Sequence, residues 1–90
     1  MIYQVIVIDL EGNKKAIDLC DNEKYMQRIT VMELKKKIAV KIPGMAADED
    51  IELVFGQERL NEENKRLFDY GIQHMSVIGM LIKLPGGLPH

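Results

Sequence analysis

The sequence predicts an α+β fold in which one main helix packs on one face of a small mixed sheet of four to five strands. Residues 2–8 and 15–20 have the composition of paired strands, and residues 30–42 repeat apolar side chains at helical spacing. Residues 77–84 form an almost continuous apolar run, too short for an ordinary helix and typical of a strand buried in the middle of a sheet. A helix over one face of the sheet then closes the core.

Length, charge and cysteine content bound the class of protein. Ninety residues make one small domain with a single modest core. The 12 basic and 14 acidic residues give a net charge of -2, so we expect no nucleic-acid partner. One cysteine allows no internal disulfide, which fits a reducing compartment. The apolar start has no basic region and is too short to span a membrane. We therefore expect a cytoplasmic and/or nuclear protein with no membrane partner, and we expect it to be monomeric.

The first two strands are predicted to form a hairpin. β-Branched and aromatic residues fill residues 2–8, turn-forming side chains and a glycine fill residues 9–13, and residues 15–20 alternate polar and apolar side chains. The alternation assigns one set of side chains to a shared core face: Tyr3, Val5, Val7, Ile17 and Leu19. The opposite face of the first strand carries Ile6 and Ile8, which is unusually apolar for a face in contact with water.

The main helix is predicted to begin at a capping box. Thr30 and Glu33 have the spacing at which a hydroxyl and a carboxylate each accept a hydrogen bond from a free amide at the start of the helix. Four aliphatic residues then recur three or four positions apart and share one helix face: Val31, Leu34, Ile38 and Ile42. Pro43 and Gly44 are expected to end the helix. The polar connection over residues 21–29 has no readable pattern.

The second half of the chain is predicted to return to the sheet. A third strand is expected over residues 53–55, with a turn over residues 56–59 and a short return that begins at Leu60. A polar loop follows over residues 61–66. Residues 67–72 then form one compact turn with apolar anchors for the core, ahead of the final strand.

Several of these segments resemble ubiquitin and its relatives. The matching motifs are Thr30-x-x-Glu33-Leu34-x-x-x-Ile38, Leu53-Val54-Phe55, Leu60, Leu67-Phe68-Asp69-Tyr70-Gly71-Ile72-Gln73 and Leu84-x-Gly86-Gly87. The resemblance covers nearly all of the chain from Met1 to Gly87. It implies the ubiquitin-like β-grasp fold over residues 1–84, with the final strand between the first and the third, followed by a flexible tail over residues 85–90.

The resemblance also implies a protein-binding surface. Ubiquitin is recognised through an aliphatic patch, and the matching positions are Leu10, Val54 and Leu81, with Ile8 where ubiquitin has a lysine. Alternation supports this placement, because inward Leu53, Ile78 and Met80 leave Val54 and Leu81 on the open face of the sheet. An exposed aliphatic cluster is typical of a protein-binding surface. The alternative is that these side chains cover a sheet face or pack against the rest of a larger polypeptide.

Some positions depart from the ubiquitin pattern. Glu52 and Glu58 replace basic residues and are expected to place negative charge beside the patch, where Lys83 is the remaining basic neighbour. These three residues are therefore candidates for determining which partners bind. Gly79 stands where ubiquitin has a histidine, and Pro85 stands where its tail has an arginine.

The tail offers a second function. In the modifiers of this family a terminal Gly-Gly carboxylate is activated, passed on as a thioester and joined to a lysine amine. The matching segment here is Leu84, Pro85, Gly86 and Gly87, and removal of Leu88-Pro89-His90 by a protease would expose Gly87. A covalent modifier would need activating and conjugating enzymes as partners. The alternative is that the glycines begin a linker.

Other candidate sites are weaker, and we expect neither catalysis nor a metal or cofactor. Cys20 and His74 could form a thiol–imidazole pair, but the sequence indicates no third orienting group. The acidic run around Asp48 and Asp50 has leucine where a calcium loop needs glycine. The lysines of the helix lack interleaved aromatic residues. The sequence therefore predicts a noncovalent ubiquitin-like interaction module whose partners are ubiquitin-reading or other ubiquitin-pathway proteins.

Overall fold

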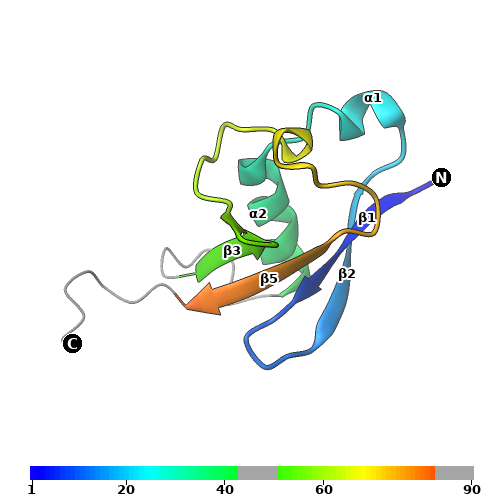
Figure 1. Ribbon diagram of the computed structural model, residues 1–90. Helices are drawn as coiled ribbons and strands as arrows, with labels where there is room; N and C mark the ends of the chain where they lie inside the picture. Colours follow the sequence, from blue (N-terminus) through cyan, green and yellow to red (C-terminus); the bar gives the residue numbers. More distant parts are fainter. Residues whose placement is uncertain (43–50, 83–90) are drawn as a thin grey trace.

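A five-stranded mixed sheet with one main helix across one face makes up the described part of the protein (Figure 1), as the sequence predicts. The computed structural model describes residues 1–42 and 51–82 of the chain. In chain order the elements are β1 (Tyr3–Ile8), β2 (Lys14–Cys20), α1 (Glu23–Met26), α2 (Val31–Lys41), β3 (Ile51–Phe55), β4 (Glu58–Arg59), the 3₁₀ helix η1 (Leu67–Tyr70) and β5 (Val77–Ile82). None of the helices in these ranges is long and apolar enough to cross a membrane.

Strand β5 lies in the middle of the sheet, whose order is β2-β1-β5-β3-β4. It pairs in parallel with β1, where Ile8 is opposite Gly79. It pairs antiparallel with β3, where Val54 is opposite the same glycine. Figure 1 shows β5 running between these two neighbours. The predicted central position of the final strand is therefore confirmed.

The hydrophobic core lies between α2 and the sheet. All four predicted core positions of the helix are buried: Val31, Leu34, Ile38 and Ile42. The sheet contributes the predicted inward-facing residues: Val5, Val7, Ile17, Leu19, Leu53, Ile78 and Met80. Tyr3, which was also predicted to face the core, packs against it and stays partly exposed. The alternation and the helical spacing thus identified the two layers that meet in the core.

The N-terminus of α2 carries the predicted capping box. The Glu33 amide donates to Thr30 Oγ1 at 3.3 Å, and the Thr30 amide donates to Glu33 Oε1 at 3.4 Å. The helix ends at Lys41 with Ile42 as its C-cap residue. Pro43 and Gly44, which were expected to end the helix, lie outside the described residues. The two reciprocal bonds satisfy two amides that would otherwise lack a partner at this end of the helix.

The loop before η1 satisfies the other free amides at the start of α2. The Val31 amide donates to the Lys65 carbonyl and the Met32 amide donates to the Glu63 carbonyl, each at 3.0 Å. A backbone bridge between Thr30 and Arg66 continues this contact. The polar loop that the sequence analysis left without a role thus closes the end of the helix.

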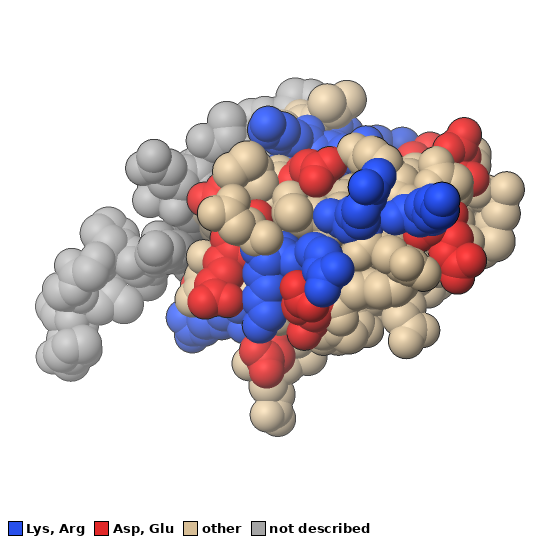
Figure 2. Space-filling model, turned by 90° about the horizontal axis from the view of Figure 1, so that it is seen from above, with Lys and Arg blue, Asp and Glu red and all other residues tan. Residues whose placement is uncertain are grey.

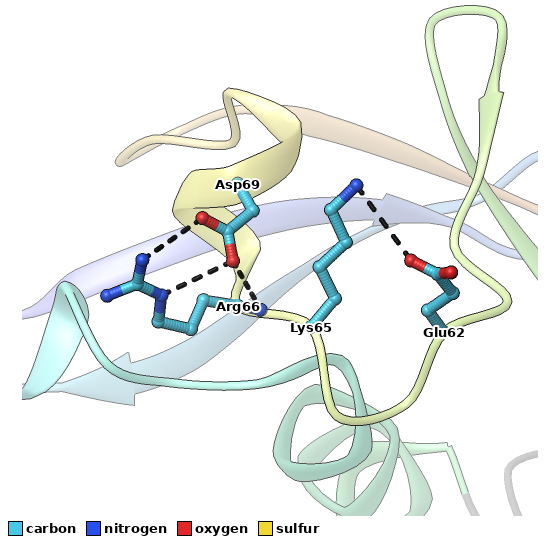
Figure 3. A network of polar contacts seen from close by, with 4 residues as sticks. All are labelled: Glu62, Lys65, Arg66 and Asp69. Carbon is cyan, nitrogen blue, oxygen red and sulfur yellow. Dashed lines mark hydrogen bonds and ion pairs between the residues drawn. The ribbon is translucent and has the colours of Figure 1, made fainter.

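A small polar network holds this loop against η1 (Figure 3). The Arg66 guanidinium donates from Nη2 to Asp69 Oδ1 at 3.2 Å and from Nε to Oδ2 at 3.3 Å, and the Arg66 amide donates to Oδ2 at 3.1 Å. These bonds to Arg66 lower the pKa of Asp69. Lys65 Nζ lies 3.9 Å from Glu62 Oε2 and 4.4 Å from the centre of the Tyr70 ring. The carboxylate of Asp69 thus fixes the entry into the predicted compact turn.

Helix α1 gives structure to the connection that had no readable pattern. It is a single turn, capped by the Asn22 side chain, which accepts from the Tyr25 amide at 2.7 Å. Met26 and Ile29 are buried in the core. The Tyr25 hydroxyl donates to Glu33 Oε2 at 2.7 Å and so ties α1 to the capping box of α2. One turn is too short to show a helical repeat, so no periodicity in the sequence indicates this helix.

The return strand β4 begins two residues earlier than predicted. The turn consists of Gly56 and Gln57 alone, and Glu58 and Arg59 pair with β3. Gly56 has φ +62°, which glycine adopts readily and which suits the first central position of a two-residue hairpin turn. Leu60 follows the strand, with its side chain buried and its amide donating to the Leu53 carbonyl at 2.8 Å. The predicted start of the return at Leu60 was therefore wrong, because a tight glycine turn needs only two residues.

Replacing Thr30 by alanine should remove half of the capping box. The Glu33 amide would lose its acceptor, and loss of an N-cap side chain costs about 0.5–2 kcal/mol. Urea denaturation should therefore show a lower free energy of unfolding for Thr30→Ala. Thr30→Ser keeps the hydroxyl and is the matched control. An alanine variant as stable as the serine variant would contradict the role assigned to this cap.

Replacing Tyr25 by phenylalanine should destabilise the fold in a pH-dependent way. The hydrogen bond from the Tyr25 hydroxyl is the main cause that lowers the pKa of Glu33, and bonds from Thr30 add to it. A carboxyl with a lowered folded-state pKa stabilises the fold above its unfolded-state pKa, about 4.3 for glutamate. That contribution is lost as the pH falls through the lower, folded-state value.

The difference in unfolding free energy between the wild type and Tyr25→Phe should therefore be larger at about pH 7 than at about pH 3. Denaturation in urea at both pH values measures it. In a Glu33→Gln background the group no longer titrates, so the difference should stay constant with pH. A pH dependence that survives in that background would assign the effect to another group.

Candidate protein-binding surface

The candidate site is the open face of the sheet, on the side away from α2. Alternation along β5 turns Ile78 and Met80 into the core and leaves Val77, Gly79 and Leu81 on the open face. Val77 and Leu81 are each 48% exposed. The strand has neighbours on both edges, as predicted, but it is buried on one face only. The apolar residues of β5 therefore contribute to an exposed surface as well as to the core.

One row of residues crosses all five strands of this face. The register aligns Lys14 of β2 with Ile8 of β1, Ile8 with Gly79 of β5, Gly79 with Val54 of β3, and Val54 with Arg59 of β4. Residues directly opposite one another in neighbouring strands point to the same face. The row therefore has a cation at each end, aliphatic side chains inside them and a glycine at its centre.

The structure places the four predicted patch residues on or beside this row. Ile8 and Val54, both half-buried, lie on either side of Gly79. Leu81 lies two residues further along the same face of β5. Leu10 lies in the turn after β1, two residues beyond Ile8, and is 36% exposed. Whether these residues bind a partner stays a prediction.

Two further aliphatic residues belong to the same surface. Ile6 is opposite Val77 in the parallel pair, so these two side chains form a second row beside the first. Ile6 was predicted to face outward, but Val77 was not, because the apolar run of β5 is typical of a buried strand. The alternation that placed Leu81 outward would also have found Val77. We call the combined set the aliphatic patch: Ile6, Ile8, Leu10, Val54, Val77 and Leu81.

The predicted negative charge beside the patch is partly neutralised. Glu52 lies opposite Leu81 on β3, and its Oε2 atom is 3.3 Å from Nη1 of Arg59. The Glu52 side chain is only 14% exposed, whereas that of Arg59 is 65% exposed. A partner that approaches this edge therefore meets the arginine first. The opposite charges of Glu52 and Arg59 therefore largely cancel at this end of the row.

Glu58 is placed differently from Glu52. It is opposite Phe55, whose side chain packs against the core on the α2 side of the sheet. Opposite residues share a face, so the register separates Glu58 from the aliphatic patch. Lys83, the third predicted flanking residue, lies outside the described residues.

The predicted processing and conjugation segment also lies outside the described residues. It consists of Leu84, Pro85, Gly86 and Gly87. The predictions of a domain that ends at residue 84 and of a flexible tail after it therefore stay predictions.

The weaker candidate sites do not assemble within the described ranges. The Cys20 thiol donates to the Asn22 carbonyl at 3.4 Å, and His74 Nδ1 accepts from the Gln4 amide at 3.0 Å. No hydrogen bond joins Cys20 to His74 in the part of the chain that the structure describes. No group of three or more metal-binding side chains occurs among the described residues. Asp48 and Asp50 lie outside them.

Charges of both signs are mixed on the part of the surface seen in Figure 2. Lysine and arginine side chains alternate there with aspartate and glutamate. A highly charged partner is steered by an extended electrostatic field of one sign, and mixed charges produce no such field. The exposed aliphatic residues of the open face of the sheet form an apolar surface of a different kind.

Comparison with known families agrees with the fold, and the matched segment contains half of the residues of the aliphatic patch. The model described as the ubiquitin family matches residues 27–85, which is more than half of the chain. The match includes α2, β3, β4, η1 and β5, and hence Val54, Val77 and Leu81. The first hairpin, with Ile6, Ile8 and Leu10, precedes the matched segment.

Proposed function

Because the chain belongs to the ubiquitin family, we propose that it is a noncovalent protein-interaction module whose partners bind the aliphatic patch on the open face of its sheet. The partners belong to the ubiquitin pathway in general. In this proposal the protein works by binding, and its described side chains perform no chemistry on the partner.

The exposed apolar side chains of β5 are the observation that carries this proposal. Val77 and Leu81 leave almost half of their surface in water in the middle of the sheet. The half-buried side chains of Ile8 and Val54 lie beside them, so the apolar area is continuous. Removal of apolar area from water contributes about 25 cal/mol for each Å² to binding, before the entropic cost of association is subtracted. A contiguous surface of this kind is a common mark of an interaction site.

The position of the patch also suits recognition. It lies on paired strands, so its side chains are held in place before a partner arrives, and little ordering cost is added on binding. The cations at the two ends of the row give a polar rim around the apolar centre, which is the usual anatomy of a protein interface. The alternative, in which the patch packs against the rest of a larger polypeptide, uses the same surface within one chain.

Leu81→Ala should weaken binding to ubiquitin-binding modules by about fivefold or more, because truncation of a central interface side chain can cost over 1 kcal/mol. Isothermal titration with a panel of such modules measures the change. Leu81 is the better probe than Val54, since it is more exposed and its truncation disturbs the core less. Urea denaturation should show little change in stability for Leu81→Ala.

Val40→Ala is the matched control for this test. Val40 is also aliphatic, is 83% exposed and lies on α2, on the other side of the molecule from the open face. Its truncation should leave every affinity unchanged. Equal affinities for the wild type and Leu81→Ala across a panel that does bind the protein would contradict the proposal.

A second candidate function is covalent modification through the diglycine. It is favoured by one observation in the sequence, the segment Leu84-Pro85-Gly86-Gly87 after β5, which resembles the tail of ubiquitin-like modifiers. In this function a protease removes Leu88-Pro89-His90, and Gly87 is then joined to a lysine amine. Activating and conjugating enzymes would be the partners.

Processing and activation test this second function directly. The chain is incubated with proteases that mature ubiquitin-like proteins, and the product is weighed by mass spectrometry. A modifier should be cut after Gly87 and then form a thioester with an activating enzyme and ATP that a reducing agent destroys. Resistance to the whole panel of proteases and activating enzymes would exclude the modifier function and leave the binding module.

A further inference from the structure

Gly79 occupies a position at which the backbone does not require glycine. Its φ angle lies outside the left-handed range, unlike those of Gly12, Gly56 and Gly71. A Cβ atom built on Gly79 would meet only the Val54 carbonyl oxygen, at 4.0 Å, which is an ordinary contact. The backbone could therefore carry a Cβ atom here without strain or clash. The fold gives no reason for the glycine.

The glycine also costs stability where it stands. A glycine inside a strand is less stable than an alanine, because it loses more backbone freedom on folding. Gly79 is in the central strand, with Ile8 on one side and Val54 on the other. A β-branched side chain between two aliphatic neighbours would add cross-strand contacts. Glycine at position 79 makes none of these contacts, which indicates that the residue serves a purpose other than the stability of the fold.

The missing side chain leaves a notch in the middle of the aliphatic patch. Its walls are Ile8 and Val54 across the sheet, and Val77 and Leu81 along β5. Ile8 and Val54 belong to strands two spacings apart, so their backbones are about 9–10 Å apart. The floor is the backbone of β5 at Gly79. We call this feature the Gly79 notch.

We propose that the Gly79 notch receives one bulky apolar side chain, of the leucine, methionine or phenylalanine class, from the polypeptide that binds the open face. The inference rests on the proposed function and adds the shape of the partner's anchor. All four residues around the notch are aliphatic, so burial of an apolar side chain there is favourable, whereas a polar side chain would find no hydrogen-bond partner among them. A small anchor such as alanine would leave the floor uncovered and lose the contacts that a filled pocket gives.

The charge at the end of the row identifies a second property of the partner. Lys14 is exposed and is in register with Ile8, beside the notch. Within the described ranges no carboxylate lies at ion-pair distance from Lys14, whereas Arg59 at the opposite end is paired with Glu52. The partner segment should therefore carry a carboxylate on the side that faces β2. The apolar anchor and the carboxylate together define the chemistry of the ligand.

The test uses the full chain and a phage-displayed library of peptides randomised at their central positions. Peptides are selected on the wild type and kept only if Leu81→Ala weakens them. The selected peptides should share a leucine, methionine or phenylalanine with an acidic residue nearby. They should bind Gly79→Val at least about tenfold more weakly, since its side chain fills the notch, and Lys14→Gln more weakly by a smaller factor. The melting temperature of Gly79→Val should rise by about 2–8 °C.

The combination of tighter folding and weaker binding is what a structural role of the glycine cannot produce. If Gly79→Val and Gly79→Ala both melt below the wild type, the glycine is needed by the fold and the proposal is overturned. If the peptides bind Gly79→Val as well as the wild type, or carry small central residues, the notch is not used although the patch is. If no selected peptide depends on Leu81, the proposed binding surface itself fails, and the notch fails with it.

Discussion

The position of β5 between β1 and β3 is the constraint on which the rest of the structure depends. β1 and β3 share no hydrogen bonds, so the sheet exists as one unit only because β5 pairs with both. The same strand supplies both layers of the molecule. Ile78 and Met80 form part of the core under α2, while Val77 and Leu81 form part of the aliphatic patch. The core and the candidate binding surface are therefore fixed by one pairing.

Local chemistry made much of the fold predictable from the sequence. The capping box at Thr30 and the helical spacing of the residues that follow it involve neighbours in the chain, so their pattern is visible without a structure. The apolar composition of β5 predicted a strand in the middle of the sheet, whereas its neighbours β1 and β3 came from the resemblance to ubiquitin, because parallel pairing with β1 leaves no local signal. Helix α1 and the return strand β4 were missed or misplaced because one turn and two residues are too short to show a period.

The candidate site, like the fold, could be predicted from the sequence only in part. Alternation alone placed Val54 and Leu81 outward, but the apolar composition of β5 hid Val77, since a run of this kind reads the same whether one face or both are buried. The ion pair between Glu52 and Arg59 depends on the register of the β3–β4 hairpin. The role proposed for Gly79 depends on its backbone angle and on the space around it, which no sequence pattern contains.

The topology of the sheet also sets the order in which the protein can fold during synthesis. Ile6 leaves the ribosome well before its partner Val77, which lies far along the chain. Until β5 emerges, the hairpins β1–β2 and β3–β4 have no strand to join them, and β1 and β3 each have an edge whose backbone groups are unpaired. Pairing between residues so distant in the chain is slow to form because a long loop must close. The nascent chain is therefore open to chaperones and to aggregation until its central strand is complete.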